Sequence, residues 1–287
     1  MEEERELDVE KIQVVGAGLM GSGIAQVAAQ SGFSVRLSDV HEGALEQGLE
    51  TIKNNLARSV ERQRISRDEM DESLGRIEPG TEYAADADLA IEAVVEVAAV
   101  KTEVLRALDE RLRDDAILAT NTSSISITRL GAQTDRPEKF VGMHFFYPVP
   151  LMELVEIIRG VETSDETCQV AHELAERLGK EPVEVQDFPG FVSNRVLMPM
   201  INEAIYCVME GVAEPEEVDK VMKLGMSHPI GPLALADLIG LDTCLHVMKV
   251  LHEGFDDSKY RPCPLLKRYV AAGWLGRKSG RGFYEYE

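Results

Sequence analysis

Three glycines follow the β-branched run 11–15 with the spacing Gly-x-Gly-x-x-Gly, and the residues after them, up to Ala29, have helix-compatible spacing. A strand, a tight turn and a helix start form the context in which such glycines bind a dinucleotide. The first glycine permits the turn, the second lets the backbone approach a pyrophosphate, and the third lets helix and strand pack closely. The pyrophosphate would lie on N–H groups at the positive helix terminus. The predicted cofactor loop contains Gly16, Gly18, Leu19, Met20 and Gly21.

An acidic residue, Asp39, ends the next predicted strand, 34–39, about 20 positions after the glycines. A carboxylate there can accept hydrogen bonds from an adenosine ribose and would repel a 2′-phosphate, which favours NAD over NADP. Two structural alternatives are a glycine-rich turn without a ligand and a strand-terminal Asp that caps the next helix. The second is compatible with the cofactor role.

A histidine and a glutamate lie on two apolar runs that flank the Pro-x-Pro corner at 148–150. If the runs pair antiparallel about Pro150, His144 and Glu156 are opposite each other. A carboxylate beside an imidazole fixes its tautomer and raises its basicity, which prepares a general base. The alternative, a hydrogen-bonded core histidine with a rim carboxylate, is favoured by the spacing alone.

Two further predicted strands end in polar residues that could face the nucleotide. The buried run 87–96 ends at Glu96, and the run 116–120 is followed by Asn121-Thr122-Ser123-Ser124. Ligands of open parallel sheets gather outside the carboxyl ends of the strands. The predicted strands alternate with helices, which are expected at 41–61, at 62–76, from the end of the run 87–96 to about 111, and at 164–178. A further strand is expected at 182–185. This alternation predicts a doubly wound α/β domain.

The segment 187–190, Asp-Phe-Pro-Gly, breaks this pattern and predicts a boundary between domains 1–187 and 188–287. The second domain reads as all-α, with helices expected at 191–210, 214–223, 232–251 and 264–272. The first of these is apolar nearly all round and carries Asn194, which needs hydrogen-bond partners.

Composition excludes several classes of function. The net charge of −21 over 287 residues argues against nucleic acid or an anionic membrane as a partner. No apolar stretch approaches the length of a membrane span, and the acidic N-terminus is unlike a signal peptide, so a cytoplasmic protein is expected. The four cysteines and six histidines form no metal-binding motif, and no metal is expected.

A cluster of cations, Lys53, Arg58, Arg62, Arg64 and Arg67, stands out in this acidic chain. An anionic substrate would require such a local positive patch. The patch is either a clamp for phosphates or a solvated helix face, and the sequence leaves both readings open.

Taken together, the sequence resembles the short 3-hydroxyacyl-CoA dehydrogenases, most nearly the bacterial 3-hydroxybutyryl-CoA dehydrogenases, over essentially the whole chain. The shared motifs are the glycine loop with Ser22-Gly23, the Gly-rich C-terminal segment, and the segments 91–93, 121–124, 142–146, 189–195 and 228–232. The resemblance implies a Rossmann-type NAD-binding domain and an all-α domain that forms a homodimer interface, with the active site between them.

The resemblance also implies residue roles and a reaction. His144 matches the family's base, Glu156 its partner, and Ser123 and Asn194 the contacts to the substrate oxygen; Asp39, Glu96, Lys101 and Asn121 match the cofactor side. The implied reaction is the reversible NAD-dependent oxidation of an (S)-3-hydroxyacyl-CoA to the 3-ketoacyl-CoA in fatty-acid or butanoate metabolism.

Three positions depart from relatives. Tyr147 replaces an Asn, a basic residue is missing near Glu153, and a CoA-binding lysine aligns with Asn54, so that Lys53 and Arg58 are the candidate substitutes. The competing predictions are a related hydroxyacid or sugar-acid dehydrogenase and a non-catalytic NAD-binding relative.

Overall fold

The computed structural model describes residues 9–286. The chain divides between Asp187 and Phe188 into two compact units, each with a hydrophobic core of its own. The division falls where the Asp-Phe-Pro-Gly segment interrupts the sequence pattern.

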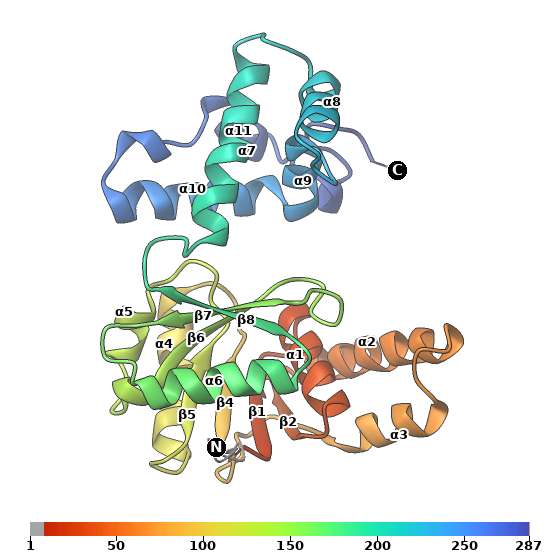
Figure 1. Ribbon diagram of the computed structural model, residues 1–287, viewed down its shortest axis with the longest axis vertical. Coiled ribbons are helices and arrows are strands. Elements are labelled where there is room, and N and C mark those ends of the chain that lie inside the picture. Colours follow the sequence, from red (N-terminus) through yellow and green to blue (C-terminus); the bar gives the residue numbers. More distant parts are fainter. Residues whose placement is uncertain (1–8, 287) are drawn as a thin grey trace, which may run out of the picture. The chain divides into compact units, whose positions relative to one another are not determined.

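The first unit is built on an eight-stranded sheet with the order β3-β2-β1-β4-β5-β6-β7-β8 (Figure 1). Neighbouring strands are parallel except for β6 and β7, which are antiparallel. The strand order reverses between β1 and β4, which is where doubly wound folds bind their ligands. The predicted α/β class is confirmed. The strands are β1 (Lys11–Val15), β2 (Ser34–Ser38), β3 (Ile77–Gly80), β4 (Leu89–Glu92), β5 (Ile117–Thr120), β6 (Phe140–Phe145), β7 (Leu154–Arg159) and β8 (Glu181–Gln186).

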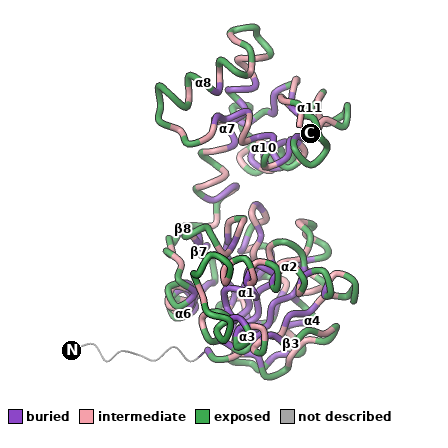
Figure 2. Tube along the Cα trace, turned by 90° about the vertical axis from the view of Figure 1, so that its right-hand side faces the viewer, coloured by how far each residue is buried: buried purple, intermediate pink, exposed green. Residues whose placement is uncertain are grey.

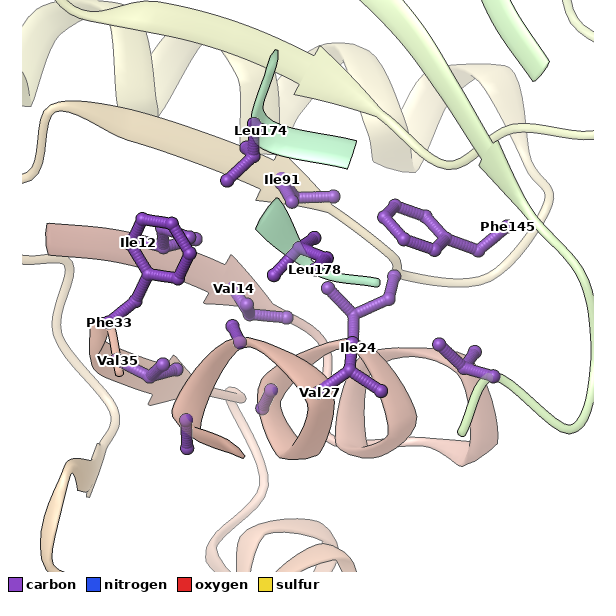
Figure 3. Packing of buried hydrophobic residues seen from close by; sticks show 14 of the residues in the cluster. Ile12, Val14, Ile24, Val27, Phe33, Val35, Ile91, Phe145, Leu174 and Leu178 are labelled. Carbon is purple, nitrogen blue, oxygen red and sulfur yellow. The ribbon is translucent and has the colours of Figure 1, made fainter. Parts of the chain in front are cut away.

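Helices cover both faces of this sheet. On one face, α1 and α6 pack on the strands, and Figure 3 shows Ile24 and Val27 of α1 and Leu174 of α6 against sheet residues such as Ile91 and Phe145. Each such fully buried side chain contributes roughly 1.5–3 kcal/mol. Figure 2 shows α1 buried over most of its length. The other face is covered by α4 and α5. The helices are α1 (Leu19–Gln30), α2 (Glu42–Glu61), α3 (Arg67–Gly75), α4 (Ala98–Arg111), α5 (Ile127–Gly131) and α6 (Asp165–Arg177), with a 3-10 turn at Pro137–Lys139.

The region after α2 differs from the prediction of one helix over 62–76. The helix α3 begins only after Ser66, whose hydroxyl accepts the N–H of Glu69 while the Glu69 carboxylate accepts the N–H of Ser66. This capping box fixes the helix start and leaves 62–66 as a turn. The edge strand β3 was not predicted, because Pro79 is a residue that sheets accept at their edges but that weakens a strand pattern. The short α5 was also missed, and β4 is shorter than the predicted 87–96.

The second unit is helical, as expected. The predicted single helix over 232–251 was wrong, because it is two helices separated at Gly240, whose φ of +103° only glycine adopts readily. The helix α7 contacts each of the four other α-helices of this unit. None of the described helices is apolar over a length sufficient for a membrane span. The α-helices are α7 (Ser193–Met209), α8 (Pro215–Gly225), α9 (Pro232–Ile239), α10 (Leu241–Phe255) and α11 (Pro264–Ala271), with 3-10 turns at Ser258–Tyr260 and Arg277–Ser279.

Candidate active site

Most of the predicted site residues of the first unit lie at one edge of the sheet. The parallel register pairs Val15 of β1 with Glu92 of β4, Glu92 with Thr120 of β5, and Thr120 with Gly142 of β6. These strands therefore end side by side, and the loops that follow them form a continuous rim. The glycine loop follows β1, Asp39 follows β2, and the 121–124 loop follows β5.

The glycine loop fits a dinucleotide pyrophosphate. A Cβ on Gly16 would lie 2.6 Å from the Ala93 carbonyl oxygen, and one on Gly21 would lie 1.7 Å from the Gly16 oxygen, so both positions require glycine. Gly18, by contrast, is exposed and faces open space. It is also the N-cap of α1 and gives that helix no side-chain cap, which leaves first-turn N–H groups available to an anion.

Replacing Gly18 with alanine is expected to weaken NADH binding about tenfold without destabilising the fold. Its φ of −70° suits any residue and its surroundings are open, so the methyl group meets no protein atom. The methyl would instead occupy the space through which the backbone approaches the pyrophosphate. NADH fluorescence titration and thermal unfolding measure the two effects. Gly75→Ala, which also faces open space, is the control and should leave binding unchanged; unaltered NADH affinity in Gly18→Ala would place the pyrophosphate elsewhere.

The Asp39 carboxylate is oriented by two backbone groups. Its Oδ2 accepts the N–H of Ala17 at 2.9 Å and its Oδ1 accepts the N–H of His41 at 3.0 Å. The carboxylate is thereby held between the glycine loop and the start of α2, where a ribose bound next to the pyrophosphate would lie. Tyr83, which no sequence spacing predicted, lies nearby: burial, and then the charge of Asp39, raise the pKa of its hydroxyl.

Glu96 organises the loop that carries Ser123. One carboxylate oxygen, Oε1, accepts the Thr122 hydroxyl at 2.6 Å, the Ser123 N–H at 2.9 Å and the Ser124 hydroxyl at 3.0 Å. Burial by itself would raise the pKa of Glu96, but the charge of Lys101 and these hydrogen bonds outweigh it and lower the pKa below its ordinary 4.5. Glu96 is therefore a carboxylate at neutral pH, and it holds Ser123 at the rim.

Asn121 ties this loop to the strand of the histidine. Its backbone N–H bonds to the Glu92 carbonyl at 2.7 Å, and its side-chain oxygen accepts the N–H of Phe145 at 2.9 Å. Asn121, which follows β5, thus links the ends of β4 and β6 through its backbone N–H and its side chain.

Lys101 is completely buried beneath the rim. Its ammonium group lies 2.8 Å from Glu92 Oε1 and 3.3 Å from Glu96 Oε2. Glu92 was not predicted as a site residue. The available signal was a charged residue between Ile91 and Ala93 in an otherwise apolar strand.

The predicted pairing of His144 with Glu156 is confirmed. The two residues are opposite each other in the antiparallel β6–β7 register, and Nδ1 of His144 lies 2.8 Å from Oε2 of Glu156. Both side chains are buried, and the Phe146 ring packs on the imidazole with the ring centroids 4.5 Å apart. Nδ1 therefore faces the carboxylate, and Nε2 is directed away from Glu156.

The remaining predicted residues lie on two helices, α7 and α2. Asn194 is in the first turn of α7 and therefore belongs to the second unit. Lys53 and Arg58 are exposed on α2, and within residues 9–286 neither forms an ion pair. The described part of the chain contains no cluster of side chains that could hold a metal ion.

Models of one known protein family match both halves of the chain. Residues 11–188 match the family model "3-hydroxyacyl-CoA dehydrogenase, NAD binding domain", and residues 190–286 match "3-hydroxyacyl-CoA dehydrogenase, C-terminal domain". A Bacillus subtilis protein named "Probable 3-hydroxybutyryl-CoA dehydrogenase" is 59% identical over 98% of this chain and 99% of its own length. A 3-hydroxybutyryl-CoA dehydrogenase of Bradyrhizobium diazoefficiens is 55% identical over 97% and 96%.

A solved structure shows the same similarity. The (S)-3-hydroxybutyryl-CoA dehydrogenase from Ralstonia eutropha is 48% identical and superimposes with a TM-score of 0.94 over 98% of this chain and 100% of that one. With both family domains matched in order over nearly the whole length, the chain belongs to the NAD-binding 3-hydroxyacyl-CoA dehydrogenase family.

Proposed function

We propose that this protein catalyses the reversible NAD-dependent oxidation of (S)-3-hydroxybutyryl-CoA to acetoacetyl-CoA. The observation that carries the proposal is the buried His144–Glu156 pair at the same sheet edge as a glycine loop fitted to a dinucleotide. The substrate in the names of the relatives reported above supports the short acyl chain.

The residues of the chain have distinct roles in this reaction. His144 takes the proton of the 3-hydroxyl group at Nε2, and Glu156 stabilises the imidazolium that forms. Ser123, held by Glu96, and Asn194 donate hydrogen bonds to the oxygen as its charge changes. The glycine loop and Asp39 would hold NAD⁺, which would supply the acceptor for the hydride from C3. In reduction the same proton returns from His144 to the ketone oxygen.

An absorbance assay at the NADH band tests this function. With acetoacetyl-CoA we expect NADH oxidation at least a hundredfold faster than with free acetoacetate at the same concentration, because the CoA moiety supplies binding energy remote from the reacting carbon. Equal rates would favour a hydroxyacid or sugar-acid dehydrogenase. Tight NADH binding without turnover on either compound would favour a non-catalytic relative.

The exposed cations of α2 are the proposed site for the phosphates of CoA. Figure 1 shows α2 and α3 as a hairpin that extends away from the sheet. Arg58 lies one helical turn beyond Asn54, so the two residues share a face of α2, and Lys53 is adjacent. An arginine one turn further along can therefore supply the charge that relatives place at the Asn54 position. Because the net charge of the chain is −21, long-range attraction cannot hold a polyanion and local cations must.

Lys53→Ala and Arg58→Ala are each expected to raise KM for acetoacetyl-CoA several-fold at low salt, with kcat little changed. Exposed charge contacts contribute on the order of 1 kcal/mol or less, and added salt should reduce the effect. Steady-state kinetics at two salt concentrations measure it. Arg129→Ala removes an exposed cation on α5 and is the charge-matched control. A truncated thioester without the nucleotide should have the same KM with the wild type and with both variants. If KM for full CoA thioesters is also unchanged, the cations of α2 form only a solvated helix face.

A homodimer through the second unit is also proposed. That unit exposes several large apolar side chains, which soluble monomers rarely gather on one small domain. They include Val196 of α7 and Val221 and Leu224 of α8, exposed by 67%, 61% and 75%. Light scattering should give about twice the 31.7 kDa chain mass, and a monomer at micromolar concentration would reject the dimer.

The proposed compartment is the cytoplasm. All four cysteines are free thiols in the structure, which is typical of proteins in reducing compartments. Fractionation of the native cells tests this proposal.

A further inference from the structure

Glu92, Lys101 and Glu96 form a charged triad at the carboxyl end of β4, in which Glu92 and Lys101 are buried and Glu96 is partly exposed. Lys101 and Glu92 have side chains only 1% and 0% exposed, and Lys101 also faces Glu96. Glu92 is fully hydrogen bonded: Oε1 accepts the Val94 N–H at 2.7 Å, and Oε2 accepts the Thr120 hydroxyl at 2.7 Å. A buried ion pair contributes little to stability compared with an apolar pair of the same volume. The triad therefore requires another explanation.

The triad carries one net negative charge, because two carboxylates surround one ammonium group. Water screens this charge only in part, because Glu92 and Lys101 are buried and the side chain of Glu96 is 28% exposed. A fixed negative charge thus lies directly beneath the rim.

The order of the strands places this charge under one particular half of the dinucleotide. Asp39 follows β2 and the glycine loop follows β1, so a dinucleotide with its ribose at Asp39 runs from β2 towards β1. Its other half must continue towards β4 and β5 to reach a substrate at His144 on β6. That half is the nicotinamide, which is cationic when oxidised and neutral when reduced.

We propose that Glu92 sets the relative affinity for the two redox states of the cofactor: the net negative charge of the Glu92–Lys101–Glu96 triad favours NAD⁺ over NADH. The inference rests on the NAD site of the proposed function but requires no particular substrate. Glu92 acts on the cofactor through space and does not touch it, because its side chain is completely buried.

The test is the ratio of the two dissociation constants, measured by calorimetry for NAD⁺ and by fluorescence for NADH, with no acyl-CoA present. Glu92→Gln preserves the shape but removes the net charge of the triad, so Kd for NAD⁺ should rise about three- to tenfold relative to Kd for NADH. Glu92→Gln/Lys101→Met keeps only Glu96 and restores one net negative charge. Its Kd ratio should return to within about twofold of the wild-type ratio, whatever happens to the absolute affinities.

Two further variants separate charge from structure. Thr120→Val removes a hydrogen bond to Glu92 without altering charge and should leave the ratio unchanged. Glu96→Gln removes the same net charge at a partly exposed position and should shift the ratio in the direction of Glu92→Gln, which keeps the test decisive if Glu92→Gln does not fold. If Glu92→Gln and Glu96→Gln weaken the binding of NAD⁺ and of NADH equally, so that the ratio of the two Kd values is unchanged, the proposal is overturned. Failure to turn over CoA thioesters would reject the proposed function instead, because these titrations contain none.

Discussion

Replacing His144 with glutamine is expected to lower kcat by about 10²–10⁴-fold and to leave NADH affinity almost unchanged. Glutamine fills similar space but cannot accept the hydroxyl proton, and loss of a general base acts on the chemical step rather than on binding. The imidazole lies at the sheet edge with Nδ1 bound to Glu156. Steady-state kinetics and NADH titration measure the two quantities.

Glu156→Gln is the companion variant to His144→Gln. It removes the charged partner but keeps the imidazole, so kcat should fall less than in His144→Gln. The pH dependence of kcat should also shift, which would not happen if Glu156 had a purely structural role. Because both side chains are buried, unfolding curves must show that each variant retains its fold. Turnover close to wild type in His144→Gln would remove His144 from the reaction.

Replacing Asp39 with alanine is expected to weaken NADH binding by roughly 10- to 100-fold, because a hydrogen bond to a charged group contributes about 1.5–3 kcal/mol. The wild type should bind NADPH far more weakly than NADH, since the carboxylate repels the 2′-phosphate. The variant should narrow this gap mainly through the loss of NADH affinity. Parallel titrations with both cofactors give the discrimination ratio.

NADPH is the internal control for Asp39→Ala. Asp39 also accepts the N–H groups of Ala17 and His41, so the substitution could disturb the glycine loop itself. A collapsed loop would weaken both cofactors equally, whereas loss of the ribose contact weakens NADH selectively. Equal use of both cofactors by the wild type would show that Asp39 does not meet the ribose.

The sequence by itself determined the features that depend on local pattern. The glycine spacing after a β-branched run predicted the β1–α1 turn, because only glycine fits where Gly16 and Gly21 approach neighbouring backbone. Antiparallel pairing about Pro150, if it occurred, would place His144 opposite Glu156, and the β6–β7 register shows this pairing. The alternation of strands and helices along the sequence predicted the α/β class.

Only the tertiary structure decided which polar and charged residues from distant parts of the chain lie together. Glu92, Lys101 and the Thr120 hydroxyl come from β4, α4 and β5, and no spacing within one segment could indicate that they meet. The break between α9 and α10 at Gly240 was likewise invisible, because an apolar periodicity can continue across a glycine that the fold uses to turn the chain. Burial decides whether a charge is solvated or held against a partner, and burial follows from packing between elements that are far apart in the chain.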